Sequence, residues 1–214
     1  GLNGAVSVNA GTGDKYNGSI NLNYRTPYFN FFGSYDSRIM NNENEGNTLR
    51  TNNINNSISY LDQQNNGVFK FGAGLDYLYD DFNTFTFSYR HRKFGFDSDG
   101  IVETSNKDSA NQLTNYFERS NVADRNMGGS NYTLSYRKTF DKKGAELTAD
   151  IILGYFSMDR TEDIVQSNYD VNLNPTSNDL EKGLSSNSNE QWTIQSNYVN
   201  PIEDFGRIET GFKV

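Results

Sequence analysis

The chain has 214 residues, of which 34% are hydrophobic and 14% aromatic, and its formal net charge is −8. That negative charge argues against a nucleic-acid-binding protein, which would need a basic face. The sequence has no cysteine and one histidine, which excludes a disulfide scaffold, cysteine catalysis and a histidine cluster. No apolar segment approaches the roughly 18–20 residues of a membrane-spanning helix. Few aliphatic and many aromatic residues favour half-buried strands joined by polar segments.

Apolar and polar residues alternate with a period of two along much of the chain, which predicts about nine β-strands. Phe32 interrupts the alternation, because it falls among the polar positions of its strand. In chain order, the apolar positions of the predicted strands are Leu2, Val6 and Val8; Ile20, Leu22 and Tyr24; Phe29, Phe31 and Tyr35; Phe69, Phe71, Ala73, Leu75, Tyr77 and Tyr79; Phe85, Phe87 and Tyr89; Tyr132, Leu134, Tyr136 and Phe140; Ala145, Leu147, Ala149, Ile151, Leu153 and Tyr155; Trp192, Ile194 and Tyr198; and Ile208, Phe212 and Val214.

The connections between these strands are of two kinds. Short turns are predicted at residues 26–27, 80–82, 141–144 and 201–205, where turn-forming residues interrupt the alternation. Long polar segments occupy residues 37–67, 95–129 and 159–189, and we expect them to be loops. Short turns at one end of a sheet and long loops at the other are typical of outer-membrane barrels.

Strand length separates a membrane barrel from a soluble sandwich. The predicted arms are about 10 residues long, as a tilted strand needs to cross a bilayer, whereas sandwich strands usually have about 5–6. Charged residues in mid-strand, such as Arg90, Arg137, Asp150 and Glu209, suit a wet lumen. We therefore predict an all-β fold, an antiparallel up-and-down transmembrane β-barrel. An open sheet edge cannot face lipid, so we expect residues 1–214 to be part of a single outer-membrane barrel domain.

Three stretches resemble the TonB-dependent outer-membrane receptors, in particular the outer-membrane β-barrel group of the Bacteroidetes. They read GLNGAVSVNAGTGDKYNGSINLNYRTPYFNFFGSYDSR, FKFGAGLDYLYDDFNTFTFSYR and YVNPIEDFGRIETGFKV. The resemblance implies a barrel of about 22 strands with a plug domain inside and a segment that contacts TonB. Neither plug nor TonB segment is recognisable in this sequence. The implied partners are outer-membrane lipid, the protein's own plug domain, the remaining barrel strands, TonB and a surface lipoprotein. Nucleic acid is not an expected partner.

The resemblance implies uptake of a large or scarce solute, an iron chelate or an oligosaccharide, across the outer membrane. One alternative is a barrel of the same group that serves surface assembly, secretion or adhesion without transport. A soluble secreted β-sandwich is a further alternative, which solubility of the folded protein without detergent would favour. No catalytic set is visible, so we expect neither an enzyme nor a cofactor.

The polar strand positions supply the candidate site residues. We expect eight of them to face the lumen, either as a cross-strand charge ladder that supports a plug or as a guide for solute. They are Lys70, Asp76, Arg90, Arg92, Arg137, Arg207, Glu209 and Lys213. His91 lies in the lipid-side register near a predicted strand end, which indicates an interfacial residue. The stretch DSDG at residues 97–100 lacks the full calcium-loop spacing, so we expect a solvated loop and no metal site.

Overall fold

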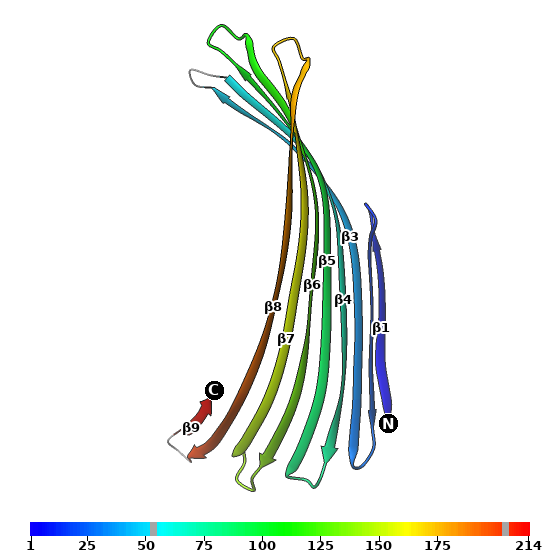
Figure 1. Cartoon of the computed structure of the whole chain (residues 1–214). Helices are drawn as coiled ribbons and strands as arrows, with labels where there is room; N and C mark the ends of the chain where they lie inside the picture. Colours follow the sequence, from blue (N-terminus) through cyan, green and yellow to red (C-terminus); the bar gives the residue numbers. More distant parts are fainter. Residues whose placement is uncertain (52–54, 203–205) are drawn as a thin grey trace.

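The computed structural model describes residues 1–51, 55–202 and 206–214, and they form one antiparallel sheet of nine strands (Figure 1). Each strand pairs with its neighbours in the chain, so the predicted all-β, up-and-down fold is confirmed. The described residues form no helix long and apolar enough to span a membrane. The strands are β1 (Leu2–Gly11), β2 (Lys15–Arg25), β3 (Phe29–Thr51), β4 (Asn55–Leu78), β5 (Asn83–Lys107), β6 (Leu113–Thr139), β7 (Glu146–Tyr169), β8 (Pro175–Ile202) and β9 (Gly206–Lys213).

The strands fall into two length classes. β1, β2 and β9 have 10, 11 and 8 residues, close to the predicted arms. The six strands between them have 23 to 28 residues. In Figure 1, β3 to β8 rise well past the tip of the β1–β2 hairpin, twist, and end in three hairpins at the upper left. We call this upper part the extension; it comprises the residues of β3 to β8 beyond Met40 and its cross-strand partners.

The prediction of long loops is wrong. The described residues of 37–67, and residues 95–129 and 159–189, continue the strands as hydrogen-bonded hairpins. Their cross-strand pairs include Asn44–Asp62, Asp99–Val122 and Glu162–Gly183. The stretch at 97–100, expected as a loop, lies within β5. These segments have polar residues on both faces, so the alternation that marks a half-buried strand is absent from them. Of the predicted turn at 201–205, Pro201 and Ile202 belong to β8, and residues 203–205 lie outside the described residues.

Two turns of the extension are built alike. In residues 108–112 and 170–174 an aspartate carboxylate accepts hydrogen bonds from two backbone N–H groups, at 2.9 Å in the turn of Asp108 and 2.8 Å in that of Asp170. The pKa of Asp170 is lowered, first by the side-chain hydrogen bond from Asn174 and then by backbone N–H donors. The fourth residue has a positive φ in both turns, 61° at Asn111 and 63° at Leu173. Asparagine tolerates this conformation far better than leucine does.

The sheet has almost no buried core of its own. Among the described residues, only two apolar side chains are buried, Ala123 and Ala145, and no large side chain is fully enclosed. An open sheet of this kind is stabilised by its backbone ladders and cross-strand pairs, and by whatever covers its two faces.

Phe32, the exception in the alternation, packs over a glycine on the neighbouring strand. Phe32 pairs with Gly74, and a Cβ built on Gly74 would lie 2.2 Å from the Phe32 ring. The ring therefore fills the space that a side chain at position 74 would occupy. An aromatic side chain over glycine pins the register of a strand pair.

We expect Gly74→Ala to destabilise the folded protein by about 1–3 kcal/mol, because the methyl group would overlap both the Phe32 ring and the Phe87 carbonyl oxygen. The measurement is the free energy of unfolding in urea, in detergent or lipid vesicles. Gly67→Ala is the matched control, since nothing lies within 4 Å of a Cβ at that position. Equal effects of the two substitutions would contradict the packing argument.

We expect Leu173→Asn to be neutral or stabilising by up to about 1 kcal/mol, because asparagine relieves the left-handed strain of the turn. The reverse change in the twin turn, Asn111→Leu, should destabilise by a similar amount. Urea unfolding midpoints of both variants check this pair. A lower midpoint for Leu173→Asn would show that the leucine side chain is needed there.

Candidate functional site

One face of the sheet, which we call the apolar face, carries a continuous row of apolar side chains across all nine strands. In this midline row each residue lies directly opposite the next on the neighbouring strand. Val214 joins the row through backbone hydrogen bonds to Ile194. The row consists of Leu2, Tyr24, Phe31, Leu75, Phe87, Leu134, Ile151, Ile194 and Val214.

Large side chains of this row are exposed to an unusual degree. Phe87 is 50% exposed, Leu134 53% and Ile194 47%. A contiguous apolar surface of this extent marks contact with a membrane or a partner.

Aromatic residues border the midline row on both sides. Toward the short turns, Phe29 and Tyr77 stack with ring centroids 5.3 Å apart, and Phe85 and Tyr136 lie 4.8 Å apart. Toward the extension, the rings are those of Tyr35, Phe71, Tyr89, Tyr132, Tyr155 and Trp192. Two aromatic girdles around an apolar band are the arrangement found in transmembrane barrels.

The apolar band has the height of a bilayer. Along β4, every apolar-face position from Phe69 to Tyr77 is apolar, and the next positions toward the extension are Gly67, Asn65 and Gln63. This run matches the roughly 9–11 residues of a tilted membrane-spanning strand. The extension therefore lies outside the bilayer, and only the lower part of the six long strands faces lipid.

The opposite face, which we call the polar face, carries hydrogen-bonded carboxylates at the level of the apolar band. Asp76 accepts hydrogen bonds from Asn30 Nδ2 at 2.9 Å and Thr86 Oγ1 at 2.7 Å. In the same cross-strand row, Asp150 accepts from Ser135 Oγ and from Gln195 Nε2 at 2.9 Å. Both carboxylates are thus held by donors from the two flanking strands.

Above these carboxylates the polar face is strongly basic. Four consecutive cross-strand rows contain seven cationic residues, and Asp36 is the only acidic residue among the described residues of these rows. Asp36 lies 3.6 Å from the ammonium of Lys70. We call this set the basic belt: Lys15, Arg38, Lys70, Arg90, Arg92, Arg125 and Arg160.

All eight residues that the sequence placed toward a lumen lie on the polar face. The register brings Lys70, Arg90 and Arg92 together in the basic belt, and Asp76 lies below them. The other four, Arg137, Arg207, Glu209 and Lys213, lie nearer the short turns or on β9. That all eight side chains face the interior of a closed barrel stays a prediction.

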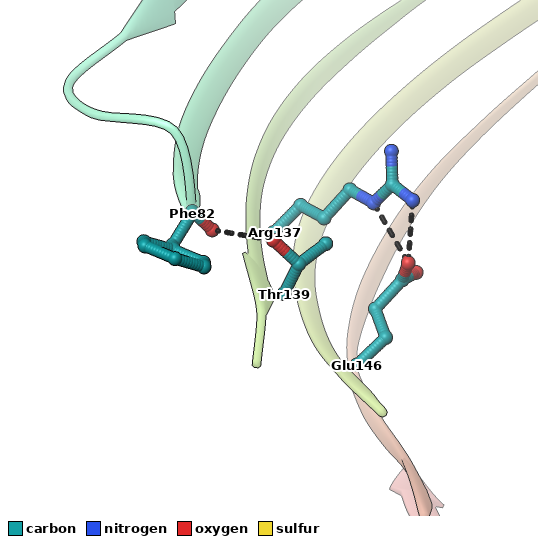
Figure 2. Close-up of polar contacts among 4 residues, drawn as sticks. All are labelled: Phe82, Arg137, Thr139 and Glu146. Carbon is teal, nitrogen blue, oxygen red and sulfur yellow. Dashed lines mark hydrogen bonds and ion pairs between the residues drawn. The ribbon is translucent and has the colours of Figure 1, made fainter. Parts of the chain in front are cut away.

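An ion pair lies at the lower edge of the polar face, near the short turns (Figure 2). Arg137 on β6 donates from Nε to a carboxylate oxygen of Glu146 at 2.8 Å, and a terminal guanidinium nitrogen donates to the same oxygen. Beside it, the backbone N–H of Thr139 donates to the carbonyl of Phe82 at 2.9 Å. Arg137 is therefore tied to the turns, away from the basic belt.

Sequence reasoning missed Arg38, Arg125 and Arg160 because each lies in a segment interpreted as a loop. A usable signal was the scarcity of proline: the chain has 3, and residues 37–67 and 95–129 contain none. Segments of that length without proline are more compatible with continued strands than with loops.

On the apolar side the extension is acidic. Asp97 and Asp124 face each other across β5 and β6, and Asp99, Glu103 and Glu118 follow on the same face. Partial burial raises the pKa of Asp97, and the facing Asp124 carboxylate raises it further. Burial and the hydrogen bond to Glu118 raise the pKa of Tyr116 to about 12. In the described part of the chain, no group of three or more His, Asp or Glu side chains is placed to hold a metal ion.

His91 lies on the apolar face at the upper end of the apolar band. Its Nδ1 is 3.0 Å from Ser130 Oγ, and its ring meets Phe69 edge-on with centroids 6.1 Å apart. The lipid-side register expected for His91 is therefore correct. The expected strand end is not, since β5 continues to Lys107.

Residues 138–214 match the model of the outer membrane protein beta-barrel family. No curated protein matches the chain. The matched residues include the end of β6, β7, β8 and β9, and thus the segments that carry Arg160 and Asp150. Together with the nine-stranded antiparallel sheet, this match makes the protein a β-barrel protein of the outer membrane.

We expect Phe87→Arg, in the midline row, to destabilise the folded protein by about 2–4 kcal/mol, the cost of arginine at the bilayer midplane. Ser88→Arg is the matched control, because residue 88 is the next position and lies on the polar face. Urea unfolding in lipid vesicles measures both variants. Equal destabilisation by the two would contradict the assignment of the faces.

Proposed function

We propose that the protein takes part in the uptake of a large or scarce solute, an iron chelate or an oligosaccharide, across the outer membrane. In this proposal residues 1–214 form part of the barrel of a TonB-dependent receptor-like protein, and they catalyse no reaction. Further strands pair with the free edges of β1 and β9, because unpaired backbone groups cannot face lipid. The expected partners are a plug domain, TonB and a surface lipoprotein.

A single observation carries the proposal: the same strands present an apolar face and a charged face at one height. At the level of the midline row one side is apolar, while the other carries Asp76, Asp150 and their polar donors. Charged groups at bilayer height are stable only where water or protein surrounds them. The polar face then lines a wet interior, which is what a passage for a hydrophilic solute requires.

The resemblance supports the finer assignment. The stretch YVNPIEDFGRIETGFKV, which resembles the receptor group, lies within the residues that match the outer-membrane barrel family. The stretch FKFGAGLDYLYDDFNTFTFSYR forms the β4–β5 hairpin, with Asp80 at its turn. There the carboxylate of Asp80 accepts from the backbone N–H groups of Phe82 and Asn83 at 2.8 and 2.7 Å.

We expect a strain that lacks the gene to lose uptake of at least one radiolabelled solute from a panel of iron chelates and oligosaccharides. Inactivation of TonB should abolish the same uptake, because the proposed transport depends on it. The gene restored on a plasmid is the control. Unchanged uptake of the whole panel, with surface proteins lost from the cell, would contradict transport and indicate a barrel for surface assembly.

A further inference from the structure

We propose that the basic belt binds a multivalent anion of the carboxylate or phosphate type, as part of the solute that the barrel takes up. This inference rests on the proposed function, in which the polar face lines the passage. It adds the charge class of the solute and the residues that contact it. The binding groups would be the guanidinium groups around Arg92 and the side-chain amides beside them.

The first argument is that cations face cations across the strands. Lys70 lies directly opposite Arg92, and Arg125 lies directly opposite Arg160. Side chains in such pairs have Cβ atoms about 4.5–5.5 Å apart, and like charges there destabilise a sheet. Asp36 beside Lys70 and Glu162 beside Arg160 offset part of this repulsion, and a shared anion would offset the remainder at Arg92 and Arg125.

The second argument is that most of these cations have no carboxylate partner among the described residues. Within the belt, Lys70 pairs with Asp36 and Arg160 with Glu162. The other five belt cations, Arg90 and Arg92 among them, lie within 4.0 Å of no described carboxylate oxygen. The Nε atoms of Arg125 and Arg160 are buried without a hydrogen-bond acceptor. Buried donors without partners destabilise a fold, so the belt has donor capacity that an anion can satisfy.

The third argument is that room exists at the centre of the belt. Two shallow hollows adjoin Arg92, one bordered by Lys70, Gly72 and Arg90, and the other by Gly129 and Gly154. The glycines themselves add no side chain to either hollow. The side-chain amides that border the hollows are those of Asn131, Asn189 and Gln191.

The belt also stands out from the charge of the whole chain. The net charge is −8, and the outward side of the extension is acidic, yet the four rows of the belt hold seven cations and one carboxylate. The belt is about 20 Å high, since each cross-strand row adds about 6.7 Å along the strand. A cationic surface of this size concentrates anions that enter from the extension.

A multivalent solute fits these features better than an acidic protein segment does. The two hollows share Arg92 and Asn131, and their borders offer amide N–H donors as well as guanidinium groups. That mixture suits compact oxygen-rich anions, for which bidentate guanidinium contacts are strong. An acidic segment of the protein over the belt is the competing explanation, and the experiment below separates the two.

The test uses the whole native protein, purified from outer membranes in detergent, with inorganic tripolyphosphate as the probe. Isothermal titration calorimetry gives the dissociation constant, and thermal unfolding with and without the probe gives the linked stabilisation. We expect the wild-type protein to bind, and Arg92→Gln to bind at least ~10-fold more weakly, the cost of a lost charge-assisted hydrogen bond. Binding should weaken as salt is added.

Lys182→Gln is the matched control. It removes the same charge from the apolar side of the extension, where Lys182 pairs with Asp163 at 3.5 Å. This variant should bind tripolyphosphate like the wild-type protein. Without the probe, the thermal midpoint of Arg92→Gln should equal or exceed that of the wild-type protein, because the repulsion with Lys70 is gone.

Three results would overturn the inference: no binding by the wild-type protein, equal weakening by Lys182→Gln, or undiminished binding by Arg92→Gln. Absence of binding together with a lower thermal midpoint for Arg92→Gln would indicate an acidic protein segment over the belt. The titration does not depend on transport. If tripolyphosphate binds as expected but the deletion strain takes up every solute normally, the proposed uptake fails and the anion site stands.

Discussion

Backbone hydrogen bonding is the constraint on which the rest of this structure depends. Lipid offers no partner to an N–H or C=O group, so at the height of the midline row each strand must satisfy its backbone on its neighbours. The up-and-down order from β1 to β9 does this by pairing each strand with its neighbours in the chain. The same ladder fixes the side-chain period at two, and hence one apolar and one polar face.

Because the side-chain period is two, the two faces of the sheet have different environments. The apolar face holds its exposed rings and aliphatic side chains at a height set by the bilayer, and the polar face gathers charge without entering lipid. At the short turns of the lower edge, Asp80 accepts backbone hydrogen bonds, and the charge of Arg137 is neutralised by its ion pair with Glu146. Farther up, Lys70 and Arg160 have carboxylate partners in Asp36 and Glu162. Arg90, Arg92 and Arg125 have none among the described residues.

The sequence was informative where the two faces differ in polarity. Alternation in the stretches around Phe87 and Leu134 predicted strands, faces and the positions of Arg90 and Arg92 correctly, because lipid on one side requires apolar residues at every second position. It failed for residues 37–67, 95–129 and 159–189, where water surrounds both sides and no residue type is excluded from either face. Cross-strand neighbours such as Arg125 and Arg160 belong to hairpins whose register only the structure reveals. That Arg125 and Arg160 lie directly opposite each other could not be predicted from their separation in the sequence.

The continuity of β3 to β8 from the membrane into the extension also has a mechanical consequence. A loop can fold over an incoming molecule at little cost, whereas a strand paired on both sides must break several hydrogen bonds to bend sharply. β4, β5, β6 and β7 are paired with both neighbours nearly to their upper tips. The surface that meets the medium is therefore a stiff wall with its shape set in advance. A molecule that bound this surface would meet a shape that exists before contact, with little ordering entropy to lose.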